Sequence, residues 1–145
     1  MVKNKLSRAG IDLSRVNLLE RQSREEYLKS MQDVDLLLDT FPFNGATTTC
    51  EALWMGLPTV TLSGNDRMVA RQGALVNELV GLSDLVADTF ASYVDIAVGL
   101  AGDLERLQWL RAQLRQKVSK SPLCDAPAFA SDFTDALETM WNARK

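Results

Sequence analysis

The sequence predicts an α/β protein built on a parallel β-sheet. Short apolar runs of strand length alternate with stretches in which apolar residues recur at helical spacing, and this alternation is typical of βαβ units. At 145 residues, with 46% apolar and 24% charged residues, the chain has the size and composition of one globular domain.

Two strands and two helices are expected in the first third of the chain. Residues 15–19 (RVNLL) and 34–38 (VDLLL) are predicted strands, and the second is nearly all apolar, as in a strand covered on both faces. Between them, Ser23 followed by Glu26 has the form of a capping box that opens a helix. A second helix is expected from about Thr47 to Met55.

The later elements continue the alternation and then become helical. Strands are expected at 58–62 and 85–87, with a turn at 63–66 and a helix from Met68 to Val80 between them. Three helices follow, at about Thr89 to Ala101, Asp103 to Val118, and from Pro127 onward. The last carries an apolar stripe made of Phe129, Phe133, Leu137 and Met140, with Trp141 beside it. We therefore expect a Rossmann-like partial parallel sheet of about four strands, with flanking helices and an α-helical C-terminus.

The composition excludes several kinds of chemistry and of partner. The chain has no histidine, which excludes a Ser-His-Asp triad, an imidazole base and a His-ligated metal. Its net charge of −3 argues against nucleic acid binding by bulk phosphate attraction. We find neither a membrane-length apolar run nor a secretory signal, and two cysteines without metal spacing fit a reducing compartment. We expect a cytoplasmic protein that binds no metal, nucleic acid or membrane.

The segment after the second predicted strand carries the candidate chemistry. Residues 39–46 (DTFPFNGA) are followed by Thr47, Thr48 and Thr49 at the start of a helix. Ligands of open α/β sheets bind at the carboxyl ends of strands, where a helix N-terminus offers free N–H groups and a positive dipole end. Gly45 allows the backbone to approach a ligand closely or to adopt a positive φ. This arrangement suits a phosphate or diphosphate.

Glu51 lies four residues after Thr47, so the two side chains share a helix face one turn apart. A carboxylate there would repel phosphate but can accept two hydrogen bonds from a ribose diol, so the segment predicts a nucleoside diphosphate site. The alternative is that Thr47 merely caps the helix and Glu51 lies on a solvated face. Asp39 is a candidate ligand contact, although capping its own loop is the better assignment. Trp54 is expected to pack in the core.

Residues 35–62 (DLLLDTFPFNGATTTCEALWMGLPTVTL) closely resemble the C-terminal catalytic region of the O-linked N-acetylglucosamine transferase (SPINDLY-like) family. The resemblance covers roughly residues 15–142 and extends to Met140-Trp141. Family members are inverting glycosyltransferases of the two-Rossmann GT-B architecture, and their nucleotide sugar, usually UDP-N-acetylglucosamine (UDP-GlcNAc), lies between the halves. The resemblance implies that residues 1–145 are a single nucleotide-sugar-binding segment from the C-terminal half of a larger enzyme.

The resemblance also implies roles for individual residues. Thr47 and Thr48 would hold the diphosphate and Glu51 the ribose hydroxyls, which matches the assignment made from spacing. Arg24 and Tyr27 occupy positions where the family contacts uracil, and the Tyr27 ring could stack on the base. The expected donor-binding residues are therefore Arg24, Tyr27, Asn44, Gly45, Ala46, Thr47, Thr48 and Glu51.

Two departures from the family pattern limit what this chain is expected to do alone. Ala46 stands where animal members have a histidine against the diphosphate, so one phosphate contact is absent. The family's phosphate-contacting lysine and its catalytic groups lie in sequence that precedes these residues. We expect the chain alone to lack turnover and to bind UDP weakly, with the UDP-sugar as substrate and no metal or other cofactor.

The preferred function is thus the donor-binding segment of a bacterial O-GlcNAc-transferase-like enzyme that acts on Ser or Thr of proteins. Its expected partners are the UDP-sugar, a missing N-terminal catalytic half with helical repeats, the protein acceptor, and a second copy through the C-terminal helix. The alternative is a non-catalytic Rossmann-like interaction or regulatory module with a vestigial nucleotide site. A related GT-B enzyme with another donor is a third possibility.

Overall fold

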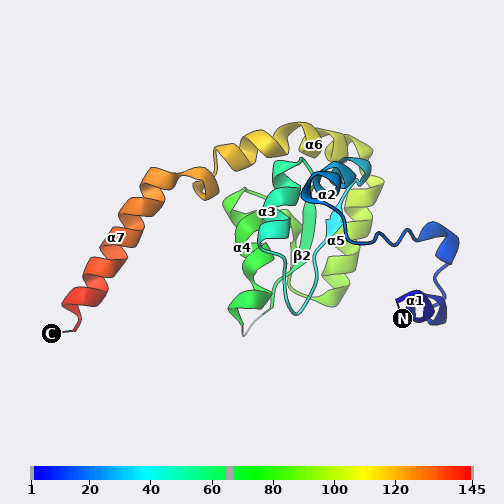
Figure 1. Cartoon of the computed structure of the whole chain (residues 1–145), viewed down its shortest axis with the longest axis horizontal. Coiled ribbons are helices and arrows are strands. Elements are labelled where there is room, and N and C mark those ends of the chain that lie inside the picture. The colour runs from blue at the N-terminus through cyan, green and yellow to red at the C-terminus, as the bar shows by residue number, and fades with distance from the viewer. Residues whose placement is uncertain (1, 65–66, 145) are drawn as a thin grey trace.

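A small parallel sheet lies between helices in the computed structural model, which describes residues 2–64 and 67–144 (Figure 1). The strand order is β1-β2-β3, with β1 at Leu37–Leu38, β2 at Thr59–Leu62 and β3 at Val86–Ala87. Both neighbouring pairs are parallel. The predicted α/β class is confirmed, with three strands in the described residues where about four were expected. Residues 65 and 66 of the predicted 63–66 turn lie outside the described residues.

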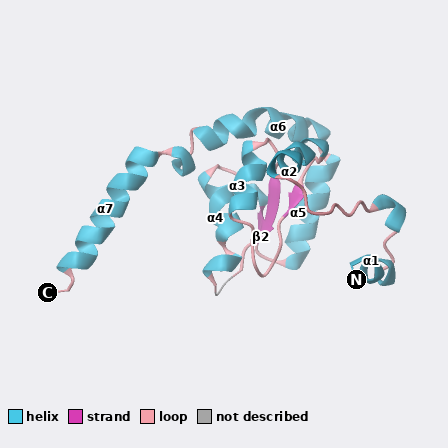
Figure 2. Cartoon of the chain, viewed as in Figure 1, coloured by secondary structure: helices cyan, strands magenta, loops and turns pink. Residues whose placement is uncertain are grey.

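The α-helices account for most of the remaining chain (Figure 2). They are α1 (Val2–Arg8), α2 (Arg24–Ser30), α3 (Thr47–Trp54), α4 (Gln72–Leu79), α5 (Phe90–Gly102), α6 (Leu104–Ser119) and α7 (Ala126–Asn142). Helices α3 and α4 connect successive parallel strands and contact each other, while α5 packs on β2 and β3. Helix α6 contacts both α3 and α5. No helix among these residues has the length and apolar character needed to cross a bilayer.

The predicted strand at residues 15–19 is wrong. Arg15 ends a short 3-10 turn, η1 (Leu13–Arg15), and residues 16–23 are irregular. The side chains of Leu18 and Leu19 are 43% and 59% exposed. In Figure 1 this segment runs out from the sheet toward α1. An apolar run becomes a strand only when a neighbouring strand takes up its backbone N–H and C=O groups, and here none does.

Strand β1 is shorter and more exposed than its apolar sequence predicts. Leu37 pairs with Thr59 and Leu38 with Val60, the first two residues of β2. Leu38 is 52% exposed, so its face of β1 lacks cover and the expectation of cover on both faces is wrong. Among the described residues β1 is also an edge strand, paired with β2 alone. The central strand β2 is the buried one, as Thr59, Val60 and Thr61 are 0% exposed.

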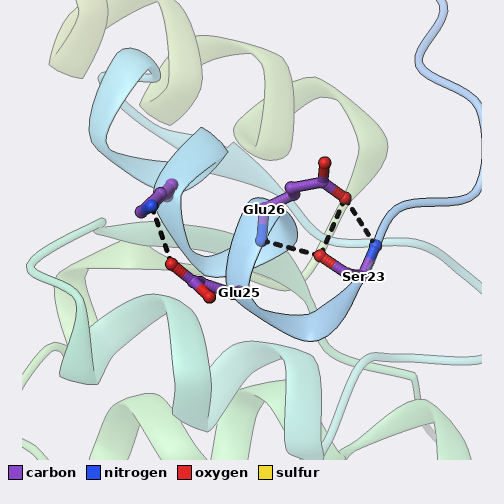
Figure 3. Close-up of polar contacts among 4 residues, drawn as sticks. Ser23, Glu25 and Glu26 are labelled. Atoms are coloured by element: carbon purple, nitrogen blue, oxygen red, sulfur yellow. Dashed lines mark hydrogen bonds and ion pairs between the residues drawn. The ribbon is translucent and has the colours of Figure 1, made fainter.

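Helix α2 begins at the predicted capping box (Figure 3). The Glu26 N–H donates to Ser23 Oγ at 3.3 Å, and the Ser23 N–H donates to Glu26 Oε2 at 2.9 Å. The Ser23 hydroxyl also donates to Glu26 Oε2 at 2.7 Å. These bonds favour the charged carboxylate, so the pKa of Glu26 lies below its usual value, chiefly because of the Ser23 hydroxyl. The sequence therefore sets where α2 starts.

The main core lies between the sheet and helices α4, α5 and α6. Helix α6 buries four apolar side chains along one face, while Leu104 in its first turn is 68% exposed. The buried four are Leu107, Leu110, Leu114 and Val118. A smaller cluster of Met31, Ala52 and Leu57 packs α2 against α3. This second cluster is what places the start of α2 beside the middle of α3.

Helix α7 forms where it was predicted but buries no side chain. Asp125 Oδ1 accepts the Ala128 N–H at 3.0 Å and so caps the first turn. The helix extends away from the rest of the molecule (Figure 1). Its predicted stripe is exposed along its whole length, at 67% for Phe129 and 58% for Met140. The apolar face of α7 is therefore the largest exposed apolar feature that we describe in this fold.

Candidate functional site

The loop between β1 and α3 lies at the carboxyl end of the sheet, as predicted, and Asp39 holds it. Asp39 is buried, at 6% exposed. Its Oδ1 accepts the N–H of Thr40 at 2.9 Å and that of Gly45 at 2.7 Å. Its Oδ2 accepts the Thr61 hydroxyl from β2 at 2.8 Å. The prediction that Asp39 caps its own loop is confirmed.

Asn44, a predicted site residue, is 0% exposed. Its Nδ2 donates to the Thr40 carbonyl at 2.8 Å, and its backbone N–H donates to the Val69 carbonyl at 2.9 Å. Its Oδ1 has no hydrogen-bond partner among the residues that the structure describes. Asn44 therefore anchors the loop through its side-chain and backbone N–H groups.

Gly45 is needed for close packing and not for a positive φ. The glycines with positive φ in the described chain are Gly10, Gly56 and Gly81. A Cβ on Gly45 would lie 3.1 Å from Thr49 Oγ1 and 3.3 Å from Asp39 Oδ1. The Gly45 carbonyl accepts the Thr49 hydroxyl at 2.8 Å. Gly45 therefore serves close packing, as one of its two predicted roles required, but the backbone lies close to the side chains of Asp39 and Thr49.

The N-terminus of α3 is open. Its N-cap residue is Ala46, which has no side-chain acceptor for the first-turn N–H groups, so the alternative that Thr47 caps the helix is wrong. Thr47 and Thr48 are exposed, whereas Thr49 is 0% exposed. Helices α2, α5, α6 and α7 are instead capped by the side chains of Ser23, Thr89, Asp103 and Asp125. The exposed Thr47 and Thr48 thus lie at the positive end of the α3 dipole, beside first-turn N–H groups that no side chain caps.

Glu51 and Arg24 come together from different helices. Arg24 Nη1 lies 2.7 Å from Glu51 Oε1, and the Glu51 side chain is only 16% exposed. The alternative that Glu51 lies on a solvated face is therefore wrong. Both residues line a pocket of about 480 Å³ between α2, α3 and the segment after α6. Its apolar wall includes Leu28, Trp54 and Leu123.

Tyr27 and Trp54 differ from their expected surroundings. Tyr27 is half-buried and packs against the cluster of Met31, Ala52 and Leu57, so part of its ring belongs to the fold. Trp54 is 38% exposed, with the Arg115 guanidinium 4.9 Å from its ring centroid, so the expectation of core packing is wrong. Trp54, at the end of α3, also lines the pocket.

Tyr93 is a site residue that the sequence did not point to. Its hydroxyl donates to the Asp39 carbonyl at 2.9 Å, and Phe41 of the same loop packs edge-on against its ring with centroids 6.2 Å apart. Burial raises the pKa of the Tyr93 hydroxyl above its usual value. No local sequence pattern predicts this contact, because it joins residues 54 positions apart.

The expectation that no metal is held overlooks one Asp-x-Asp pair, Asp33 and Asp35. Both side chains are exposed and precede β1, at the opposite end of the strand from the α3 N-terminus. Among residues 2–64 and 67–144, no group of three or more His, Cys, Asp or Glu side chains is placed to hold a metal ion.

Comparison with known proteins identifies the family. The model of glycosyl transferase family 41 matches residues 1–133. The chain belongs to this family. Among its relatives, a probable UDP-N-acetylglucosamine–peptide N-acetylglucosaminyltransferase SPINDLY from Eustoma exaltatum subsp. russellianum is 40% identical over 138 residues, which are 94% of this chain and 15% of that protein. The UDP-N-acetylglucosamine–peptide N-acetylglucosaminyltransferase of Caenorhabditis elegans is 34% identical over 91% of this chain and 11% of its own length.

The fold is also seen in a solved structure, the O-GlcNAc transferase mutant K341M of Thermobaculum terrenum. It superposes with a TM-score of 0.89 at 38% sequence identity, over 97% of this chain and 27% of that one. The resemblance to O-GlcNAc transferases and the Rossmann-like GT-B assignment are therefore confirmed. The chain spans about 15% of the length of the SPINDLY relatives that it matches.

Proposed function

We propose that this chain binds the nucleoside diphosphate of a UDP-sugar, UDP-GlcNAc, as the donor-binding segment of a family-41 glycosyltransferase. The observation that carries the proposal is the open N-terminus of α3, where exposed Thr47 and Thr48 follow an N-cap without a side-chain acceptor. An anion placed there accepts hydrogen bonds from backbone N–H groups and from the two hydroxyls, and it lies at the positive end of the helix dipole.

Glu51 extends the proposed site from the phosphates to the ribose. It lies four residues after Thr47, which is about 6 Å further along the helix axis. Its carboxylate accepts hydrogen bonds from the two ribose hydroxyls, and its ion pair with Arg24 holds it in place. Arg24 and Tyr27, at the start of α2, then lie beside the base, with the free part of the Tyr27 ring available for stacking.

In the complete enzyme, we propose that a Ser or Thr hydroxyl of a protein attacks the anomeric carbon of the sugar. The bond from that carbon to the diphosphate breaks with inversion, and the hydroxyl proton passes to a base outside residues 1–145. The role of this chain is to stabilise the charge that develops on the departing diphosphate, through the α3 amides and the hydroxyls of Thr47 and Thr48. The proposal routes no step through a metal ion or another cofactor, and it assumes a cytoplasmic enzyme.

Calorimetric titration of the chain with UDP, UMP and ADP tests the proposal. We expect UDP to bind more tightly than UMP, since only UDP places a second phosphate at the helix tip. The double substitution Thr47→Ala/Thr48→Ala should weaken UDP binding by about tenfold or more, because each hydroxyl bond to a charged phosphate contributes about 1.5–3 kcal/mol. The matched control is Thr134→Ala/Thr139→Ala on α7, where both hydroxyls donate only to the helix backbone.

Absence of any UDP heat from the unmodified chain would contradict the proposal and favour a non-catalytic interaction module. Equal affinity for UDP and ADP would instead favour a related enzyme with another nucleotide donor. Equal losses in the site variant and in the α7 control would show that binding does not involve the tip of α3.

A further inference from the structure

The side chain of Asp39 joins the ends of β1 and β2 to the loop that leads into α3. Its two carboxylate oxygens accept three hydrogen bonds, from the N–H of Thr40, the N–H of Gly45 and the hydroxyl of Thr61. We propose that Asp39 is a positioning residue for the donor: it holds the Gly45 peptide so that the first turn of α3 points at the diphosphate. This inference rests on the proposed function.

The backbone of Asp39 is itself anchored on both sides. Its N–H donates to the Val60 carbonyl of β2 at 2.9 Å, and its carbonyl accepts the Tyr93 hydroxyl of α5 at 2.9 Å. The side chain therefore starts from a fixed place at the carboxyl end of the sheet. Its direction is set by Thr61, which is 0% exposed and donates to Oδ2.

Gly73 provides the space that the Asp39 carboxylate occupies. Gly73, in the first turn of α4, lies so close that a Cβ there would overlap both Asp39 Oδ2 and Thr61 Oγ1. A side chain at position 73 would displace the carboxylate from the hydroxyl that orients it. The lack of a side chain at Gly73 thus helps to position Asp39.

The effect of Asp39 reaches α3 through the Gly45 peptide. Asp39 Oδ1 holds the Gly45 N–H at 2.7 Å, and the Thr49 hydroxyl holds the Gly45 carbonyl at 2.8 Å. With both ends of the residue held, the direction of the next peptides, at Ala46 and Thr47, is fixed before a ligand arrives. Preorganised N–H groups bind a phosphate without the cost of ordering the loop.

The bonding pattern suits a carboxylate. All three partners donate, and an ionised carboxylate is a pure acceptor, so each bond is made without competition. An asparagine keeps the oxygen that holds Thr40 and Gly45, but it turns an N–H toward the Thr61 hydroxyl, which must then rotate to accept. Alanine removes every bond and leaves the Gly45 N–H without its acceptor.

The test measures the affinities of UDP and of uridine in parallel, in the 145-residue chain. Asp39→Ala should weaken UDP binding by about tenfold or more, because bonds to a charged group are lost, and leave uridine binding unchanged. Asp39→Asn should recover UDP affinity to within about threefold of the original, since the acceptor for Gly45 is retained. Thr61→Val, which removes only the hydroxyl that orients Oδ2, should fall between the two and serves as the decisive variant where Asp39→Ala does not fold.

The matched control is Asn77→Ala, at the other end of β2. Asn77 is 0% exposed, and its Nδ2 donates to the Thr59 carbonyl at 2.8 Å, so this change also removes a buried hydrogen bond. A purely structural role for Asp39 predicts that its variants weaken UDP and uridine alike, as a loss of folded protein does, and this outcome would overturn the inference. Unchanged UDP affinity in Asp39→Ala or Thr61→Val would overturn it as well. If the unmodified chain binds no UDP, the proposed function fails and this inference falls with it.

Discussion

Gly56 is a single residue that determines how α3 ends and how the chain continues into β2 beside α6. It has a φ of +83°, and a Cβ on it would lie 2.8 Å from the Arg111 carbonyl of α6. Gly56 thus ends α3 and lets the chain turn under α6 into β2. The positive φ and the contact both exclude a side chain at this position.

We therefore expect Gly56→Ala to lower the free energy of unfolding by about 1–3 kcal/mol, the cost of a strained backbone residue. The control is Gly99→Ala in the middle of α5, where a Cβ meets nothing within 4 Å. That change should raise the free energy of unfolding by about 0.5–1 kcal/mol, since alanine favours a helix interior. Urea unfolding of the two variants measures both effects, and a shift of the same sign in both would contradict this account.

At the same scale, the sequence predicts the chemistry of the site better than its contacts. The spacing of Thr47 and Glu51 places both on α3, and the exposure of Thr47 agrees with that prediction. The ion pair between Glu51 and Arg24 is not readable from spacing, because it depends on how α2 packs on α3. Tyr93 could not be found at all, since its contact with Asp39 depends on the tertiary fold.

At the scale of elements, prediction succeeded where local signals decide. The predicted capping box sets the start of α2. Gly56 and Gly81, which follow α3 and α4, both adopt the positive φ that is typical just after a helix end. It failed at residues 15–19, because an apolar run of that length becomes a strand only beside another strand. The exposed outer side of β1 has no such neighbour among the described residues.

Helix α7 carries the clearest prediction at this scale. Its stripe includes Phe129 and Phe133, whose rings stack with centroids 5.9 Å apart and are 67% and 55% exposed. Because so large an apolar face is costly in water, we expect the isolated chain to associate with itself through α7. The sedimentation mass should rise with protein concentration.

Phe129→Ala/Phe133→Ala should weaken that association by about tenfold or more, since burying one phenylalanine side chain contributes about 1.5–3 kcal/mol. The control is Val98→Ala on α5, which removes an apolar side chain of the same 67% exposure as Phe129 from the body of the protein. A chain that stays monomeric at high concentration would show that the α7 face is not used for self-contact.

At the scale of the whole molecule, the fold presents two open apolar surfaces. One is the face of β1 that carries Leu38, which is 52% exposed, and the other is the apolar face of α7. The chain matches about 15% of the length of its SPINDLY relatives, and we propose that the rest of such an enzyme covers these surfaces. The alternation of strands and helices predicted the fold class. What covers the exposed surfaces of β1 and α7 could not be predicted from these residues.

The central claim is that the tip of α3 binds a diphosphate, and amide NMR during a UDP titration tests it most directly. The account predicts saturable shifts that are largest at the N–H groups of residues 45–49, with smaller shifts at Glu51 and at the start of α2. Uridine should move the second group and leave the first nearly unchanged, because it lacks the phosphates. Shifts confined to α7 or to the far end of the sheet, or no shift at all, would contradict the account.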